Sequence, residues 1–239
     1  MKQYLLLLVF YVLNTNLLSA QAIGANGVQS DSRIIDLFED IKNRVGKKTT
    51  STQKIKGSPY FDETFKAAEV EYFGEILKDK IYLRLNAFSD EMEMASSPLM
   101  GSSENILIKN NKVSCIINGD TYRYLGFIAD NQPPAVGYLK ELFKGRNFAF
   151  YERNSKVYME ATVARTSLER SFPARFIEKT EYYYSVNNGA LNQLKLSRKK
   201  ILTKLKPYSS SIKMFMNDND TKLKSLQDVV ALFNFLDQV

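Results

Sequence analysis

The sequence contains no histidine and a single cysteine, Cys115. Without an imidazole, Ser-His-Asp and Cys-His catalysis and His-ligated haem all lack their central group. One thiol cannot form an internal disulfide, and without histidine it cannot complete the usual set of four zinc ligands. Gly-rich phosphate loops, dinucleotide fingerprints and internal repeats are missing too. The sequence therefore predicts no cofactor, no metal and no catalytic residue of these classes.

Long apolar runs are scarce, and the most sustained one occupies residues 5–13. It is shorter than the roughly 20 residues that a transmembrane helix needs. It follows the charged Lys2 and leads to the small residue Ala20, so residues 1–20 predict a cleavable secretory signal peptide, with a second possible cleavage site two residues later. No cysteine stands near the cleavage site to carry a lipid. We expect an exported protein, periplasmic or extracellular, without a stable membrane anchor after signal cleavage.

The chain has 33 Lys and Arg against 26 Asp and Glu, a net charge of +7. Such an excess can indicate binding to nucleic acid or to anionic membrane surfaces. Export away from the cytoplasm argues against nucleic acid. We expect a solvated basic surface and an unidentified envelope or extracellular partner.

The remaining sequence divides into three segments. Residues 21–53 predict a flexible leader with a short amphipathic helix, in which Ile34 and Leu37 begin a helical apolar spacing. Residues 54–196 alternate in short segments separated by turn residues, which predicts an antiparallel β-meander that can curl into a half-open barrel. Residues 197–239 change to helical spacing and predict a C-terminal helical cap. The predicted fold class is mainly β, in an α+β arrangement.

Five turns predict the hairpins of the meander: Ser89-Asp90, Asn110-Asn111, Asn118-Gly119, Asn187-Asn188-Gly189 and a weaker one at Asn154-Ser155. A two-residue turn in the first hairpin pairs Phe88 with Glu91 and Asn86 with Glu93. The charged residues Arg84 and Glu93 then share the solvent face. The prediction is a half-buried hairpin.

Three C-terminal helices are expected to cover one face or one end of the sheet. Ser197 can cap the first, and Pro207 ends it. The second contains Ile212, Phe215 and Met216. The third opens at Asp220 or Thr221, with an apolar stripe of Leu223, Leu226, Val230, Phe233 and Leu236.

Cys115 has two interpretations. A lone cysteine in an exported protein can be a reactive nucleophile. The Asn110-Asn111 turn, however, places Cys115 opposite Ile106 and on one face with Val113 and Ile117. Because burial among apolar side chains raises a thiol pKa, we expect an inert core residue.

Carboxylates offer the remaining catalytic option, and six are grouped in sequence: Glu69, Glu71, Glu75, Asp90, Glu91 and Glu93. A glycosidase needs two carboxyl groups roughly 5–10 Å apart across the bond that it cleaves. Carboxylates on the solvent side of a hairpin are also ordinary, and Arg84 can pair with Glu93 across the strands. The surface-charge interpretation is favoured, and no catalytic residue is assigned.

The acidic run Asn217-Asp218-Asn219-Asp220 invites a calcium interpretation. Counting from Asp218, the run lacks the glycine at the sixth loop position and the glutamate at the twelfth, where Val229 stands. We therefore reject an EF-hand and interpret the run as a helix cap.

Aromatic residues are frequent in the expected strands: Tyr122, Tyr124, Phe148, Phe150, Tyr151, Tyr182, Tyr183 and Tyr184. They could form a platform for a glycan or a peptide. Strands favour aromatic residues in any case, so core and cross-strand packing is the preferred interpretation.

The segments Lys56–Phe61 and Leu83–Glu93 carry a resemblance to a family of uncharacterised exported bacterial proteins, in which a GSPYL strand leads to an LRYNAYNDEFEV-like hairpin. Similar later landmarks are Gly137-Tyr138-Leu139, Pro173-Ala174-Arg175-Phe176, Glu181-Tyr182-Tyr183-Tyr184 and Ser197-Arg198-Lys199-Lys200. The chain departs from the pattern at Leu85, where the family more often has tyrosine. The resemblance implies export and a β-plus-helix module, and supplies no catalytic residues.

Three functions remain open from the sequence. The first is an exported non-enzymatic module that binds a ligand, an envelope component or a protein partner. The second is a carboxylate-dependent hydrolase of an envelope or extracellular polymer. The third is a carrier of apolar ligands inside a curved sheet.

Overall fold

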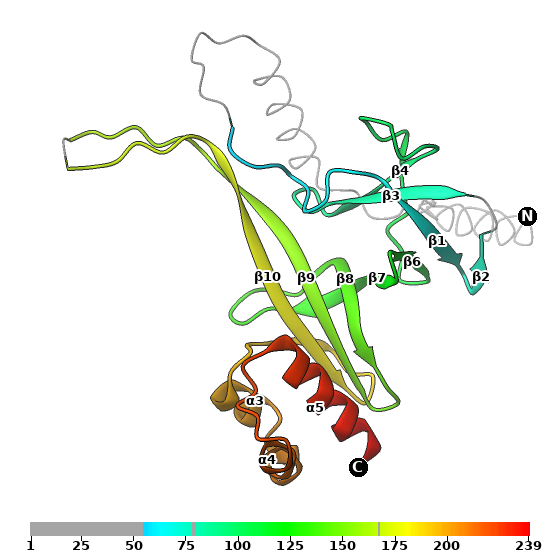
Figure 1. The fold of residues 1–239 in the computed structure, drawn as a ribbon, viewed down its shortest axis with the longest axis vertical. Coiled ribbons are helices and arrows are strands. Elements are labelled where there is room, and N and C mark those ends of the chain that lie inside the picture. The colour runs from blue at the N-terminus through cyan, green and yellow to red at the C-terminus, as the bar shows by residue number, and fades with distance from the viewer. Residues whose placement is uncertain (1–54, 78–79, 167) are drawn as a thin grey trace, which may run out of the picture. The chain divides into compact units, whose positions relative to one another are not determined.

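The computed structural model describes residues 55–77, 80–166 and 168–239 (Figure 1). The expected signal peptide, 1–20, and the leader, 21–53, lie outside these residues. The strands are β1 (Lys66–Tyr72), β2 (Glu75–Ile76), β3 (Ile81–Asn86), β4 (Glu91–Ala95), β5 (Asn105–Ile106), β6 (Val113–Ile117), β7 (Asp120–Ile128), β8 (Ala135–Lys144), β9 (Phe148–Met159), β10 (Arg175–Val186) and β11 (Leu191–Leu194). The helices are α3 (Arg198–Lys204), the 3₁₀ turn η1 (Lys206–Tyr208), α4 (Ser209–Asp218) and α5 (Leu226–Gln238).

All of these strands belong to one sheet, ordered β11-β10-β9-β8-β7-β6-β1-β3-β4-β5, with β2 paired to β1. The run from β6 to β11 pairs consecutive antiparallel strands, so the predicted meander and the mainly β class are confirmed. β11 also pairs in parallel with β7, through Leu191 with Phe127 and Asn192 with Ile128. This pairing makes the sheet mixed and closes β7 to β11 into a ring.

Side chains of all five ring strands pack against one another. The cluster comprises Phe127, Ala129, Leu139, Ala149, Tyr151, Tyr183 and Leu191. Tyr183 is fully buried, and its ring lies 4.8 Å from that of Phe127. The ring is therefore held by a packed core of its own.

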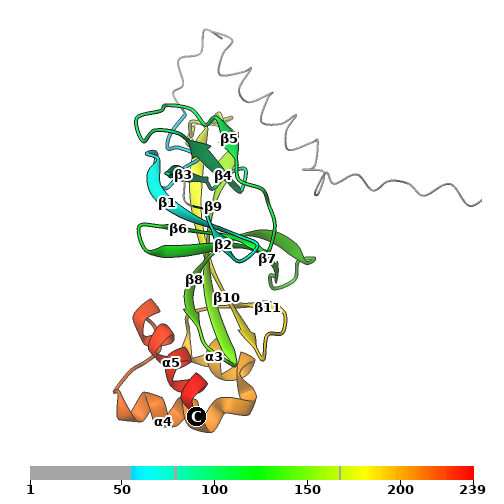
Figure 2. The same cartoon turned by 90° about the vertical axis from the view of Figure 1, so that its right-hand side faces the viewer.

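The C-terminal helices pack on the other face of β8, β9, β10 and β11 (Figures 1 and 2). Phe233 of α5 stacks on Phe150 of β9, with ring centroids 4.8 Å apart. Ser197 caps α3 by accepting a hydrogen bond from Lys200 N, as expected. The start of β9 and the end of β10 are covered on both faces, so consecutive residues are buried there, namely Phe148 to Glu152 and Tyr183 to Ser185. None of the helices in the described part of the chain is long and apolar enough to cross a membrane.

The last helix begins later than expected. Its N-cap is Ser225, whose Oγ accepts a hydrogen bond from Asp228 N at 3.1 Å. Asp220 and Leu223 have positive φ values of 45° and 52°, so the chain before Ser225 cannot be helical. The buried residues of α5 are Val229, Leu232, Phe233 and Leu236, a stripe rotated from the expected one.

The β3–β4 hairpin has a wider turn than expected. Asn86 pairs with Glu91 and Arg84 with Glu93, so the predicted pairing of Phe88 with Glu91 is wrong. The cause is the Asn86 side chain, whose Oδ1 accepts hydrogen bonds from two backbone N–H groups of the turn. A side chain that satisfies turn amides stabilises a four-residue turn.

Two further hairpin predictions are wrong and two are confirmed. The turn at Asn110 exists, but the strand before it pairs with β4 and the strand after it with β1 and β7. Asn154 lies inside the continuous strand β9, opposite Thr180, whose Oγ1 donates a hydrogen bond to Asn154 Oδ1. The turns at Asn118-Gly119 and Asn187-Asn188-Gly189 each join two paired strands, as predicted. All three asparagines have positive φ.

Beyond their paired length, β9 and β10 continue as a hairpin extension over residues 160–166 and 168–174, which we call the finger. Figure 1 shows it projecting away from the rest of the described fold. Thr162 and Phe172 exchange two backbone hydrogen bonds of 2.9 and 2.8 Å across it. The antiparallel pairing of β9 and β10 therefore recurs at this one bridge within the finger.

Candidate functional site

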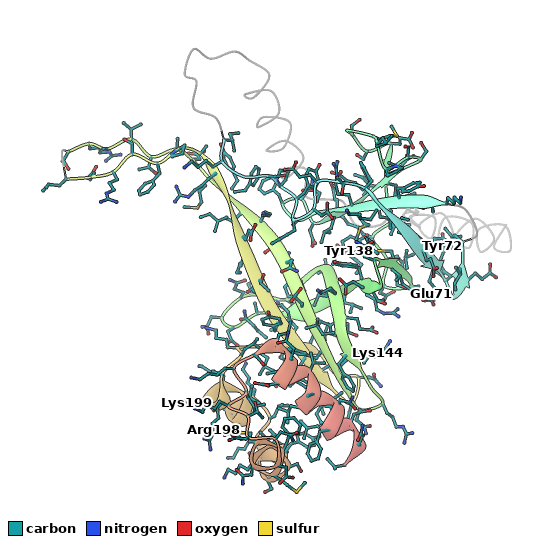
Figure 3. All side chains as sticks on the ribbon, in the orientation of Figure 1. Glu71, Tyr72, Tyr138, Lys144, Arg198 and Lys199 are labelled. Atoms are coloured by element: carbon teal, nitrogen blue, oxygen red, sulfur yellow. The ribbon has the colours of Figure 1, made fainter. Side chains whose placement is uncertain are left out.

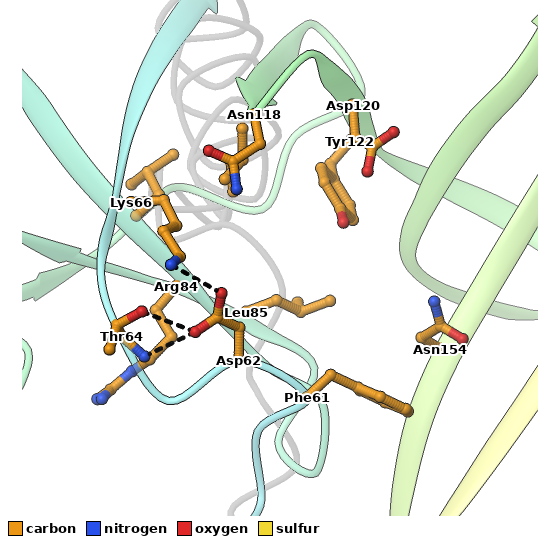
Figure 4. Close-up of a pocket in the computed structure, with 12 residues that line it drawn as sticks. Phe61, Asp62, Thr64, Lys66, Arg84, Leu85, Asn118, Asp120, Tyr122 and Asn154 are labelled. Carbon is orange, nitrogen blue, oxygen red and sulfur yellow. Dashed lines mark hydrogen bonds and ion pairs between the residues drawn. The ribbon is translucent and has the colours of Figure 1, made fainter.

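A pocket of about 240 Å³ lies where β1, β3, the β6–β7 turn and β9 converge (Figure 4). Its volume is slightly below the roughly 300–1,000 Å³ of sites for drug-sized ligands. It therefore fits a small molecule or one unit of a polymer. Its lining comprises Phe61, Asp62, Thr64, Lys66, Leu83, Arg84, Leu85, Ile117, Asn118, Asp120, Tyr122 and Asn154.

Two polar side chains of the lining have no hydrogen-bond partner among the described residues. They are the phenol of Tyr122 and the exposed amide of Asn118. Figure 4 shows the Tyr122 hydroxyl directed into the hollow. Burial, with a smaller contribution from the neighbouring Asp120, raises the pKa of Tyr122 to about 12. The phenol is therefore neutral and can both donate and accept a hydrogen bond.

Asp62 forms one wall of the pocket within a local hydrogen-bonded turn. Its Oδ1 accepts hydrogen bonds from Thr64 Oγ1 at 2.7 Å and from Thr64 N at 3.0 Å. Lys66 Nζ lies 3.2 Å from Asp62 Oδ2. The hydrogen bond from the Thr64 side chain is the main cause that lowers the pKa of Asp62. This carboxylate is therefore ionised at neutral pH, and the pocket presents a fixed acceptor next to a lysine.

A chain of polar contacts fixes the opposite wall. Lys140 Nζ lies 3.1 Å from Glu152 Oε1 and 3.7 Å from Asp120 Oδ2. Asn154 Nδ2 donates to Glu152 Oε1 at 2.7 Å, and Asn154 Oδ1 accepts from Thr180. Asn154 is thus held in one orientation, whereas the Asp120 side chain keeps half of its surface exposed.

A buried ion pair supports the floor. Arg84 Nη2 lies 2.6 Å from Glu93 Oε2, and both side chains are more than nine-tenths buried. Arg84 also donates to the carbonyl of Glu63 at 2.7 Å, and its guanidinium lies over the rings of Tyr60 and Phe65. One charged side chain thereby ties the segment before β1 to the β3–β4 hairpin.

The β3–β4 turn is anchored on the ring through Asp90. Asp90 Oδ1 accepts a hydrogen bond from Tyr138 N at 3.2 Å, and Arg153 Nη2 lies 3.6 Å from Oδ2. A Cβ on residue 137 would overlap this carboxylate, so Gly137 permits the approach. Burial raises the pKa of Asp90, and the charge of Arg153 opposes that rise. Asp90 therefore has a structural role that joins the two parts of the sheet.

The six carboxylates considered from the sequence do not form a site. Glu93, expected on the solvent face, is buried against Arg84, which corrects the surface-charge interpretation for that residue. Glu91 lies 3.7 Å from Lys109. Glu71, which is labelled in Figure 3, accepts a hydrogen bond from Ser114 Oγ at 2.9 Å. The remaining members of the set, Glu69 and Glu75, are exposed, and none of the six lines the pocket.

The aromatic set belongs mainly to the core. Tyr183 and Phe150 are fully buried, and Phe148, Tyr151 and Tyr184 are less than one-tenth exposed. Packing is therefore the correct interpretation for these residues. Within the aromatic set, Tyr122 is the residue that lines the pocket.

Cys115 is buried in the core as expected, but with different neighbours. It lies opposite Val70 of β1 and Tyr122 of β7, and not opposite Ile106. Its side chain is fully buried, and burial raises its pKa to about 12. Both effects keep the thiol protonated and out of reach.

We expect the folded protein to resist thiol reagents. A maleimide should modify Cys115 only when denaturant is added, with one label per chain measured by mass spectrometry. The denatured protein is the control for reagent activity. Rapid labelling in native buffer would contradict a buried, protonated thiol.

The run at 217–220 forms the end of α4 and the turn that follows it. Asn219 is the C-cap of the helix, and its Nδ2 donates to Phe215 O at 2.9 Å. In the described ranges, no three His, Cys, Asp or Glu side chains are placed to hold a metal ion.

Sequence reasoning missed the pocket residues Asp62, Asn118, Asp120 and Asn154. A local signal existed for the first, because Asp-x-Thr favours a side-chain-capped turn. Asn118 and Asp120 flank a glycine that was recognised as a turn signal alone. Their convergence depends on the pairing of β1 with β6, which local patterns do not encode.

The pocket's residues and geometry carry the inference of function. No protein-family model, curated protein or solved structure matches this chain.

Proposed function

We propose that the chain is an exported, non-enzymatic binding module whose pocket holds one sugar unit of an envelope or extracellular glycan. The Tyr122 hydroxyl carries this proposal, because it is directed into the pocket and makes no hydrogen bond to another described residue. Tyr122 is half-buried, so a ligand hydroxyl can replace water as the hydrogen-bond partner of its phenol. Export rests on the signal-peptide pattern of residues 1–20.

The rest of the lining suits a polyhydroxylated ligand. Each sugar hydroxyl donates and accepts, and the pocket offers both functions in the Asn118 amide, the Tyr122 phenol and the Asp120 carboxylate. Phe61 is 44% exposed at the rim and can pack against the apolar face of a sugar ring. Asp62 and Lys66 already pair with each other, so the pocket presents no strong net charge to its ligand.

The chemistry of the walls favours binding over hydrolysis. A glycosidase needs a carboxylic acid whose raised pKa keeps it protonated. The pKa of Asp62 is instead lowered, so this group lacks the property of a general acid. The carrier of apolar ligands has less support, because packed aromatic and aliphatic side chains fill the core shared by the ring strands.

Binding can be tested with a panel of hexoses, N-acetylhexosamines and hexuronic acids, using calorimetry and ligand-observed NMR. We expect Tyr122→Phe to weaken binding of the sugar with the highest affinity by about 3–10-fold. This factor corresponds to the net free energy of one neutral hydrogen bond. Because the pKa of Tyr122 is about 12, affinity should not change with pH through titration of this phenol near neutrality.

Tyr124→Phe is the matched control, since Tyr124 lies on the same strand and is half-buried outside the pocket lining. It should leave affinity unchanged. Equal affinities of wild type and Tyr122→Phe, or no binding across the panel, would refute the sugar-binding proposal. Release of cleaved products from oligosaccharide probes would support the hydrolase alternative instead.

A further inference from the structure

One edge of β10 is open between two partners. At the start of the strand, Phe176 N donates to Lys56 O and Lys56 N donates to Ala174 O, both at 2.9 Å. Further along, β11 begins its pairing with β10 at Tyr182. Between these two partners, over residues 177–181, no described residue pairs with this edge of β10.

The backbone groups of alternate β10 residues face the open edge. Phe176 N faces it, whereas Lys179 O faces β9 and accepts a hydrogen bond from Ser155 Oγ at 3.4 Å. Glu178 and Thr180 therefore direct their N–H and C=O groups outward. No hydrogen bond to another described residue satisfies these four groups. They repeat every second residue, at about 6.6–6.8 Å, as in any strand that awaits a neighbour.

A pocket of about 560 Å³ lies beside this edge. Its lining comes from residues 129–132 after β7, from 179–182 of β10 and from 193–196 at the end of β11. The chain turns away after β11, where Ser197 N donates to Lys195 O and Ser197 then caps α3. The place beside Thr180 that a longer β11 would fill is therefore open. It admits an extended segment of about five residues.

Cations gather at the end of this pocket. Lys204 Nζ lies 2.8 Å from Asp130 Oδ1. This hydrogen bond lowers the pKa of Asp130, and the charges of Lys195 and Lys200 lower it further, so three ammonium groups lie near one carboxylate. Lys195 and Lys200 are exposed and form no ion pair with a described residue. The chain from 182 to 217 contains no Asp or Glu to balance them. This end of the pocket therefore favours an anionic group.

The charged side chains of the edge itself are already paired. Such charges normally protect an open edge from an added strand. Here Glu178 lies 2.8 Å from Lys156 Nζ of β9, and Lys179 Nζ lies 3.0 Å from Glu181. Each negative charge is thus matched by a positive one within the same sheet, which leaves the excess charge to Lys195 and Lys200.

We propose that the open edge of β10 binds an extended acidic peptide of a partner protein, which adds to the sheet in line with β11. A polypeptide backbone carries donors and acceptors at the repeat of the Glu178 and Thr180 groups, so main-chain hydrogen bonds supply affinity. Lys195 and Lys200 select acidic side chains. This site shares no lining residue with the pocket of Tyr122, so it is a second binding site.

Fluorescence anisotropy tests the proposal with the purified chain and labelled seven-residue peptides that alternate valine with glutamate, glutamine or lysine. We expect the glutamate peptide to bind at least about tenfold more tightly than the other two, because charge pairs form only with it. A glutamate peptide that is N-methylated at every residue keeps the charge and loses the backbone N–H groups. It should bind as weakly as the glutamine peptide.

Two substitutions at one position separate the backbone from the side chain. Glu178→Pro removes an outward N–H, and an edge strand tolerates proline where its N–H would face solvent. Glu178→Ala loses the same side chain and keeps the N–H, so it is the matched control. We expect the glutamate peptide to bind Glu178→Pro about 3–10-fold more weakly than Glu178→Ala. Circular dichroism verifies the fold of both.

A charge reversal tests the cations. Lys195→Glu should weaken binding of the glutamate peptide and strengthen binding of the lysine peptide. Lys213→Glu is the matched control, because Lys213 is exposed on α4 and makes the same change of net charge away from this pocket. It should leave both affinities close to those of the wild type.

Amide hydrogen exchange, measured by NMR, provides a readout that needs no substitution. In the free protein the amides of Glu178 and Thr180 should exchange quickly, while those of Phe176 and Tyr182 are protected by their partners. Saturation with the glutamate peptide should slow the exchange of Glu178 and Thr180.

Three results would overturn the proposal. They are equal affinities for the glutamate, glutamine and lysine peptides, equal affinities of Glu178→Pro and Glu178→Ala, and fast exchange of Glu178 and Thr180 at saturating glutamate peptide. Slow exchange of both amides in the free protein would also overturn it. If that protection grew with protein concentration, it would assign the edge to a second copy of the chain.

Discussion

Arg84→Met is expected to lower the free energy of unfolding by about 3–5 kcal/mol, because it leaves the carboxylate of Glu93 buried without its counter-charge. Glu93 would retain hydrogen bonds from Tyr60 Oη at 2.9 Å and Asn86 Nδ2 at 3.0 Å. Neither neutral group replaces a guanidinium at 2.6 Å. Chemical unfolding monitored by circular dichroism measures the loss.

Arg123→Met is the matched control for this prediction. Arg123 Nε lies 3.0 Å from Glu141 Oε2, but both side chains are a fifth or more exposed. Solvent screens such a pair, so we expect a loss of at most about 1 kcal/mol. Equal losses in Arg84→Met and Arg123→Met would contradict the special cost of the buried charge.

A double variant separates charge from packing. In Arg84→Met with Glu93→Leu, no charge is left buried, so the loss should be smaller than the sum of the two single losses. Purely additive losses would instead assign the effect to the contacts of Arg84 with the rings of Tyr60 and Phe65. Since Arg84 also lines the pocket, Arg84→Met should also weaken the proposed binding of a sugar unit.

Phe233→Ala is expected to lower the free energy of unfolding by about 3–5 kcal/mol, since it removes a fully buried ring from the interface between helices and sheet. Phe233 stacks on Phe150 and lies within 6.3 Å of the rings of Phe148 and Tyr184. The cavity would face β9 and β10 together, where the helices meet the ring strands. Chemical unfolding, with near-UV circular dichroism as a probe of aromatic packing, measures the effect.

Phe235→Ala, two residues along the same helix, is the control. Phe235 is half-buried and contacts Phe215 of α4, with ring centroids 5.4 Å apart. Its loss should be close to about 1 kcal/mol, the centre of the usual distribution. If both substitutions cost the same, the stack on Phe150 would not be the dominant contact of the cap.

Short sequence patterns were sufficient to predict the features that depend on a few neighbouring residues. Asn118-Gly119 predicted a hairpin because both residues tolerate the positive φ that its turn requires. Ser197 predicted a helix start because its hydroxyl satisfies a free amide. The burial of Cys115 followed from the apolar residues that alternate around it.

Local chemistry failed where a side chain or a distant strand changed the pairing. Asn86 widened the β3–β4 turn by accepting two of its amide hydrogens, which moved Glu93 opposite Arg84. Asn154 resembled a turn residue, but pairing with β10 satisfied it within a strand. In both cases the polar side chain can make hydrogen bonds either within a local turn or within paired strands. The rest of the fold decides which of these two arrangements forms.

Hydrophobic periodicity and turn residues are local properties, so they were enough to predict a mainly β chain with a helical C-terminus. The position of β1 between β3 and β6, and the pairing of β11 with β7, became known only from the three-dimensional structure. Those long-range pairings bury the Arg84–Glu93 pair and bring Asp62, Asn118 and Tyr122 to one pocket. The reason is physical: the free energy of such pairings comes from packing between segments far apart in the chain, and no short pattern records it.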